Sequence, residues 1–419
     1  MRKISKISLV AAVAVAGFST ANAQPLEEAI KNVDVSGSVV YRYNNSDNTA
    51  NTPSDQAENN NYKIGLNLSS KVNDYVKFNS RFVVGNSLNG DFAKLNSSKE
   101  AGSEDGDAGA EVRLTNAYFG FTAIPNTVVN VGKQGLTTPY TVAVDINGNE
   151  QNGTGILALS TFGPITAGAG YFNATNLQDS GNGSSYTTNH RGVIQNGYDM
   201  YVATVQGDLD FVKLEAWYAG MQNTFDTYTL AATSNLDLAE NAKLGLEARY
   251  VNLQLNNRVS NNILNLESDD NSMFRFAVDG KFSIVNARLA YTKTGKDGGL
   301  TALDQDAKNT SLGWNITSNG IADADYFQAA LGVDILDNLN LTAHYGNLES
   351  DATTNRTLSS ISANVLGEKL EQEEIYGQLT YKMSKNLSTY LRYGQYEVKV
   401  GGEKEVDQDM GRLQVAYTF

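Results

Sequence analysis

Residues 33–43 read VDVSGSVVYRY, and the alternation in this stretch decides the fold class. Apolar or small side chains stand at every second position from Val33 to Tyr43, and Asp34, Ser36 and Arg42 stand between them. A period of two residues predicts a β-strand with one apolar face and one polar face.

The same pattern recurs along the chain, for example in LGLEARY at 244–250 and LSTYLRY at 387–393. An even number of such segments is typical of bacterial outer-membrane barrels. We predict 18 strands, at 33–44, 61–70, 75–86, 110–122, 127–134, 155–162, 165–173, 197–207, 211–221, 227–236, 243–254, 272–280, 282–292, 325–334, 338–347, 372–382, 386–396 and 408–419.

Composition excludes several classes of site and partner. The 419 residues include no Cys and only two histidines, His190 and His344, so a disulfide scaffold, a thiolate metal site and a His-rich metal centre are excluded. The formal charge of −14 argues against a nucleic-acid partner. A mean hydropathy of −0.34 does not exclude a membrane barrel, because alternating strands average apolar with polar positions.

The first 23 residues have the features of a bacterial secretory signal peptide. Arg2, Lys3 and Lys6 precede a short apolar run, and an A-x-A cleavage site, residues 21–23, ends the segment. We therefore predict export, with residues 24–419 as the barrel domain. No later stretch approaches the 18 apolar residues of a transmembrane helix.

The connections predict an all-β, transmembrane antiparallel β-barrel. Short turns alternate with long polar loops, the layout of periplasmic turns and extracellular loops. The five prolines fall outside strand interiors, as a closed barrel requires. The predicted long loops are 45–60, 87–109, 135–154, 174–196, 255–271, 293–324, 348–371 and 397–407.

Side chains on the two strand faces favour a barrel over a sandwich. Tyrosines stand near strand ends on the apolar face, as at a membrane interface, and an aromatic, Phe419, ends the last strand. The tyrosines are Tyr250, Tyr291, Tyr345, Tyr381, Tyr393 and Tyr417, and the strand arginines on the polar face are Arg42, Arg81, Arg113, Arg249, Arg275, Arg288, Arg392 and Arg412. On the lipid face each arginine would cost about 2–4 kcal/mol at the bilayer midplane, so we expect the polar face to line a lumen.

The third long loop, 135–154, is the predicted pore constriction. It carries Asp145 and Glu150 and no basic residue. Opposite it we expect the wall cations Arg42, Arg81, Arg113 and Lys133, which would create a transverse field across the gap. Glu247, Arg249, Arg275, Arg288, Arg392 and Arg412 would line the rest of the pore.

No cofactor is required by this interpretation, but two alternatives remain for the segment Asp145 to Glu150. Its oxygen ligands could bind Ca²⁺ together with Glu247, whereas the Asn-Gly pair favours a plain turn.

Acidic residues predicted in loops would attract cations at the pore mouth and bridge divalent ions to lipopolysaccharide. They are Glu100, Glu104, Asp105, Asp107, Glu267, Asp269, Asp270, Glu371, Glu373 and Glu374. The expected result is mild cation selectivity that weakens with salt.

The start of the chain, MRKISKISLVAAVAVAGFSTANA followed by QPLEEAIKNVDVSGSVVYRY, resembles the major outer-membrane porins of Campylobacter and its relatives. VNVGKQ at 129–134 and the terminal RLQVAYTF are similar as well. The resemblance implies an outer-membrane, 18-stranded trimeric porin that passes ions and small hydrophilic solutes.

A general diffusion porin is the predicted function, and three other functions are alternatives to it. A substrate-specific channel would show an aromatic or arginine track in the lumen. A secreted β-rich adhesin would be soluble without detergent. A phospholipase-like enzyme would need a Ser–His pair, but His344 falls on the inner face by parity and His190 in a Gly/Ser-rich loop, so we expect no enzyme.

Overall fold

The computed structural model describes residues 33–50, 55–86, 90–95, 110–179, 194, 198–263, 268–351 and 368–419. The predicted signal peptide, His190 and the acidic residues Glu100, Glu104, Asp105, Asp107 and Glu267 lie outside these ranges. Among the described residues, no helix is both long and apolar enough to cross a membrane.

Strands dominate the described chain, and the two helical pieces are one turn or little more. The helical pieces are η2 (Leu177–Asp179) and η3 (Arg258–Ile263). The strands are β1 (Val33–Asn48), β2 (Asp55–Asn73), β3 (Val76–Asn86), β4 (Ala93–Lys94), β5 (Ala110–Phe121), β6 (Thr127–Gly135), β7 (Asn152–Phe162), β8 (Ile165–Thr175), β9 (Met200–Leu209), β10 (Val212–Met221), β11 (Phe225–Ala239), β12 (Ala242–Leu255), β13 (Asp270–Phe282), β14 (Val285–Thr294), β15 (Ala324–Leu336), β16 (Leu339–Ser350), β17 (Leu370–Lys382), β18 (Leu387–Val400) and β19 (Glu403–Thr418).

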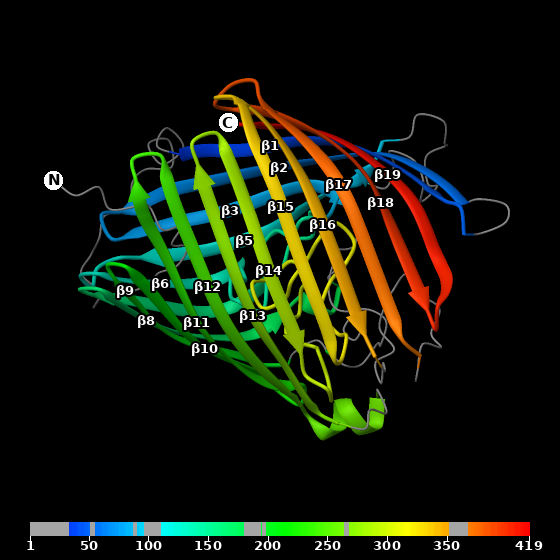
Figure 1. The fold of residues 1–419 in the computed structure, drawn as a ribbon. Coiled ribbons are helices and arrows are strands. Elements are labelled where there is room, and N and C mark those ends of the chain that lie inside the picture. Colours follow the sequence, from blue (N-terminus) through cyan, green and yellow to red (C-terminus); the bar gives the residue numbers. More distant parts are fainter. Residues whose placement is uncertain are drawn as a thin grey trace.

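Eighteen of these strands form one closed antiparallel barrel, as predicted (Figure 1). Sequence neighbours pair throughout, except that β3 pairs with β5, because the two-residue β4 lies beside β2 only. The seam closes where β1 pairs with β19, from Ser38 opposite Thr418 to Asn48 opposite Gln408. The seam also joins Phe419 to Gly37 through two backbone hydrogen bonds.

The predicted faces of the six tyrosines and of three strand arginines agree with the structure. The six tyrosines assigned to the apolar face are all exposed on the outer wall, whereas Arg42, Arg249 and Arg275 are buried inside the barrel. The ring–hydroxyl combination suits a position where lipid meets water.

Two predicted loops are instead mostly strand. Residues 45–60 and 397–407 were assigned to loops, but β1 and β2 continue to Asn48 and from Asp55, and β18 and β19 leave only a two-residue turn, 401–402. Both faces are polar there, as in Asn45 opposite Glu58, so hydropathy gives no signal. Backbone pairing alone keeps these strand ends extended.

The prediction that Glu371, Glu373 and Glu374 lie in a loop was wrong. All three belong to β17, which begins at Leu370. The strand from 282 was also placed three residues early, because Ser283 and Ile284 form a turn with positive φ at Ser283.

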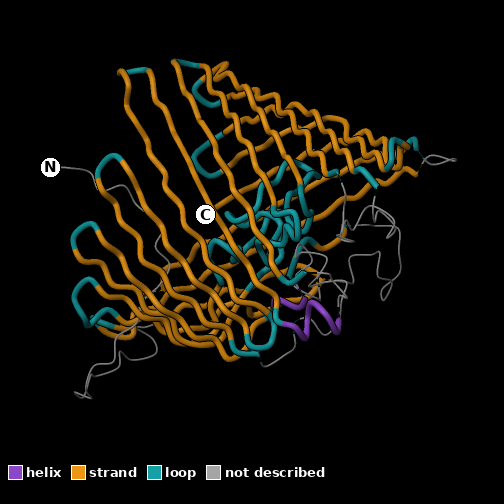
Figure 2. Tube along the Cα trace, turned by 60° about the horizontal axis from the view of Figure 1, so that its bottom comes forward, coloured by secondary structure: helices purple, strands orange, loops and turns teal. Residues whose placement is uncertain are grey.

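The buried core lies inside the barrel, near its loop end. Two connections leave the rim and enter the lumen, and we name them L3 (residues 136–151) and L7 (residues 295–323). Figure 2 shows loop segments within the ring of strands. Leu136, Tyr140, Leu300 and Leu303 pack against the inner wall of β8–β13. Farther along L7, Ile316 packs against the wall of β15–β19, so L7 crosses from one side of the lumen to the other.

Candidate functional site

L3 is attached to the wall by a buried group of charges. Glu150, only 2 % exposed, pairs with Lys63 at 2.6 Å and with Arg81 at 2.9 Å. Lys63 also donates to the carbonyl of Gly148, and Arg42 donates to that of Ile146 at 2.9 Å. The structure therefore brings together three residues predicted for the constriction, Arg42, Arg81 and Glu150, as contacts of L3 with the wall rather than as charges facing each other across open water.

Two further residues predicted for the constriction, Lys133 and Arg113, lie outside this group of charges around Glu150. Lys133 shares the β6 face of Val131, which is 40 % exposed on the outer wall, and its ammonium donates to the carbonyl of Leu114. Its assignment to the pore was wrong, because small residues around 110–134 hid the strand register. Arg113 pairs across the ladder with Val83, a fully buried residue of the inner face, so Arg113 is on the lumen side.

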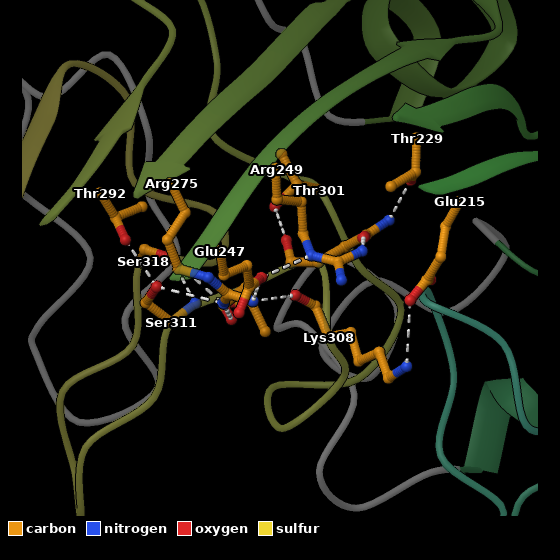
Figure 3. A network of polar contacts seen from close by, with 12 residues as sticks. Glu215, Thr229, Glu247, Arg249, Arg275, Thr292, Thr301, Lys308, Ser311 and Ser318 are labelled. Atoms are coloured by element: carbon orange, nitrogen blue, oxygen red, sulfur yellow. Dashed lines mark hydrogen bonds and ion pairs between the residues drawn. The ribbon is translucent and has the colours of Figure 1, made fainter. Parts of the chain in front are cut away.

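L7 is held by the wall residues that were predicted only to line the pore. Glu247 pairs with Arg249 at 2.9 Å and Arg275 at 2.6 Å (Figure 3). Arg275 then donates to the carbonyls of Thr310 and Lys308, at 2.5 and 2.9 Å. One carboxylate therefore orients two guanidiniums, and Arg275 also donates hydrogen bonds to the backbone of L7.

The two loops are joined to each other as well as to the wall. Leu303 donates its backbone N–H to the carbonyl of Tyr140 at 2.9 Å, and Asn309 does the same to Pro139 at 2.9 Å. Thr229 of β11 links the Asn309 side chain to the Tyr140 hydroxyl. L3 and L7 thus form one plug that narrows the lumen.

Three carboxylates meet where L3 touches L7. Asp145, Asp304 and Asp306 offer oxygen atoms that all lie within 4.8 Å of one another. Burial, together with the neighbouring Asp306, raises the pKa of Asp145 to about 6, although hydrogen bonds from Asn149 oppose the shift. Burial and Asp306 also raise the pKa of Asp304.

The predicted turn in L3 is present, and the predicted calcium partner is not beside it. Gly148 has a φ of 88° and donates to the carbonyl of Asp145 at 2.9 Å, which closes the turn. Glu247 is occupied by Arg249 and Arg275, so Asp145 meets L7 carboxylates in its place.

A group of arginines lines the part of the wall that faces L3 from the side opposite to these carboxylates. Arg42, Arg392 and Arg412 hydrogen-bond to the neutral side chains of Gln414, Gln378 and Asn44, respectively. The backbone of Ile146 lies between the positive arginine group and the acidic group. Its carbonyl accepts a hydrogen bond from Arg42, and its N–H donates one to Asp306 at 2.8 Å. Fixed charges of opposite sign thus lie on the two sides of this segment of L3.

Below the plug, the lumen widens toward the turn end. A cavity of about 440 Å³ lies between L7 and the wall, and one of about 760 Å³ continues toward the turns. Arg288 and His344 line both. Arg288 pairs with Asp279 at 2.6 Å, and His344 stacks on Tyr376 with ring centroids 4.4 Å apart.

Sequence reasoning missed L7 as a pore element. The signal was present, because apolar residues such as Leu300, Leu303 and Ile316 are unusual in a solvated surface loop. It also missed Asp304, Asp306 and the inward position of Glu374.

Comparison with solved structures finds the same fold in outer-membrane channels. OpdK of Pseudomonas aeruginosa, solved with vanillate, has a TM-score of 0.70 and 15 % identity over 93 % of this chain and 99 % of that one. OpdL of P. aeruginosa has 0.70 and 16 %, over 93 % and 99 %. OccAB2 of Acinetobacter baumannii has 0.67 and 15 %, over 92 % and 98 %. At such low identity the likeness concerns the fold alone.

Among curated proteins, no relative matches this chain. A family model does match, over residues 1–419, and its family is described as the Campylobacter major outer membrane protein. This agrees with the resemblance seen at the start of the chain, and it excludes the secreted adhesin, because the family resides in the outer membrane. The chain is therefore an outer-membrane β-barrel that belongs to the Campylobacter major outer membrane protein family.

Proposed function

We propose that this barrel is a general diffusion porin, which passes ions and small hydrophilic solutes passively and prefers cations mildly. The observation that carries the proposal is the pair of cavities below the plug, which share Arg288 and His344 and are bordered by polar side chains. A polar interior below a plug of two loops suits hydrated solutes.

The proposed cation preference rests on a group of carboxylates in the plug. Lys63 and Arg81 offset Glu150, and Arg249 and Arg275 offset Glu247. Asp145, Asp304 and Asp306 lie together as an acidic group where L3 meets L7. Acidic residues near the mouth, such as Asp269 and Asp270, add to it and would bridge divalent ions to lipopolysaccharide.

Planar-bilayer conductance of purified protein tests the porin function. Discrete steps, arriving in threes if the protein is the trimer that the resemblance implies, are expected. Absence of conductance from folded, heat-modifiable protein would refute it. The reversal potential in a salt gradient measures the cation preference, which should fall as salt rises.

A substrate-specific channel is the second candidate, and the arginine group favours it. Arg392 lies 4.9 Å from the Trp314 ring centroid and 5.0 Å from that of Tyr376, so aromatic and guanidinium groups stand together in the lumen. An anionic aromatic solute would suit both. Saturable flux of vanillate, the molecule in the OpdK structure, would favour this candidate, whereas linear flux would favour general diffusion.

We also propose that Asp145, Asp304 and Asp306 bind Ca²⁺. The group offers only oxygen donors, and a cation would offset the burial and the repulsion from Asp306 that raise the pKa of Asp145. Isothermal titration of calcium into detergent-solubilised protein tests this without any conductance. Unchanged heat on substitution of Asp304 by Asn would refute it.

A further inference from the structure

One carboxylate of the wall holds residues 314–316 of L7 through hydrogen bonds from the backbone and not through an ion pair. Glu374 of β17 points into the barrel and is only 2 % exposed. It accepts three consecutive backbone N–H groups, from Trp314 and Asn315 at 2.8 Å each and from Ile316 at 3.3 Å. Both carboxylate oxygens are used, and hydrogen bonds to an ionised acceptor are stronger than neutral ones.

Two glycines make room for this contact. A Cβ atom on Gly313 would lie 1.6 Å from Oε1 of Glu374, and one on Gly346 of β16 would lie 3.2 Å from its Cγ. A side chain at Gly313 would therefore displace the carboxylate. The loop and the wall are both shaped to bring Glu374 against the backbone.

The contact places an indole beside two arginines. The Trp314 ring meets Tyr376 edge-on, with centroids 5.4 Å apart. The guanidinium carbons of Arg392 and Arg412 lie 4.9 and 5.6 Å from the Trp314 centroid. The ring face attracts both cations and covers part of the surface that an anion would otherwise approach.

The other arm of L7 does not depend on Glu374. Arg275 donates hydrogen bonds to residues 308–311, whereas Glu374 accepts hydrogen bonds from residues 314–316. Ile316 is fully buried against the wall, so apolar packing gives the second arm an additional hold. Loss of the carboxylate should therefore shift the position of Trp314 and leave the plug in place.

We propose that Glu374 sets the ion selectivity of the pore by holding Trp314 over Arg392 and Arg412. It is a positioning residue, because it acts through the indole and does not touch a solute. The proposal rests on the channel function proposed above. Without this contact the two guanidiniums would face the lumen more openly, and the preference for cations would decrease.

Tryptophan fluorescence tests the positioning step without any conductance. The chain has only two tryptophans, so Trp217→Phe leaves Trp314 as the sole reporter. In that background Glu374→Gln should raise iodide quenching, since loss of charged hydrogen bonds shifts the held-to-free ratio about 10- to 100-fold. Glu373→Gln, an exposed neighbour on the outer wall, is the matched control.

Gly313→Ala disrupts the same contact from the side of the loop, and it replaces Glu374→Gln in the test if that variant does not fold. Heat modifiability on gels shows whether each variant folds. Unchanged quenching in both folded variants would overturn the proposal.

Reversal potentials then test selectivity. Glu374→Gln should shift them toward anions, and Glu373→Gln should not. Increased quenching with an unchanged reversal potential would also overturn the proposal. If the unmodified protein conducts no ions, the channel function fails, and with it the selectivity claim, while quenching still reports whether Glu374 holds Trp314.

Discussion

Removal of the Glu150 carboxylate should release L3 from the wall. In Glu150→Gln the side chain keeps its size, but Lys63 and Arg81 lose their shared counter-ion. Their side chains are only 7 % and 14 % exposed, so water cannot readily replace the carboxylate. The predicted result is a plug that spends more time away from the wall.

The magnitude follows from burial and geometry. Arg81 binds both oxygens of Glu150, at 2.9 and 3.0 Å, and Lys63 binds Oε1 at 2.6 Å. Removing one partner of a buried ion pair costs about 3–5 kcal/mol, which corresponds to a factor of about 10²–10⁴ in the attached-to-released ratio. The lower end is the better estimate, because Lys63 retains the Gly148 carbonyl and Arg81 retains Asn67.

Single-channel recording is the assay. Glu150→Gln should give larger and noisier conductance steps and a reversal potential shifted toward anions, since two cations are left unpaired. Adding Lys63→Met should recover part of the change, because one of those cations is then absent. Glu240→Gln, at an exposed turn, removes the same charge and is the control. Unchanged step size and noise in Glu150→Gln would refute the anchoring role.

Three further predictions concern other parts of the barrel. Because burial raises the pKa of Asp145 to about 6, above its ordinary 3.8, the folded protein binds this proton more tightly than the unfolded chain does. As the pH drops through 6, the cation preference measured by reversal potential should therefore fall, while the stability that this group contributes should rise. Asp145→Asn should flatten both profiles. Gly155→Ala should abolish the heat-modifiable band on gels, because its Cβ would lie 2.0 Å from a backbone carbonyl of β8, whereas Gly280→Ala meets open space and should fold. Deleting Phe419 removes two hydrogen bonds to Gly37 at the seam and should cost about 1–3 kcal/mol in urea unfolding; an unchanged midpoint would contradict it.

Strand positions could be predicted because the lipid-facing wall imposes a strict period of two. Leu391 and Tyr393 are exposed outside, Arg392 lies between them inside, and this order can be read directly from the sequence. The same rule failed for Lys133, where glycine and alanine neighbours obscure the two faces. It also missed the polar ends of β1 and β2, since strands above the membrane need no apolar face.

The sequence by itself determined the barrel, its number of long strands and the side of the wall on which its arginines stand, because each is a local consequence of alternation. Only the tertiary structure decided which charges lie against one another. Glu150 of L3 meets Lys63 of β2 and Arg81 of β3, whereas Asp145 of L3 meets Asp304 and Asp306 of L7. Such contacts depend on how two loops fold into a lumen and join residues that are far apart in the sequence, so no periodic pattern records them.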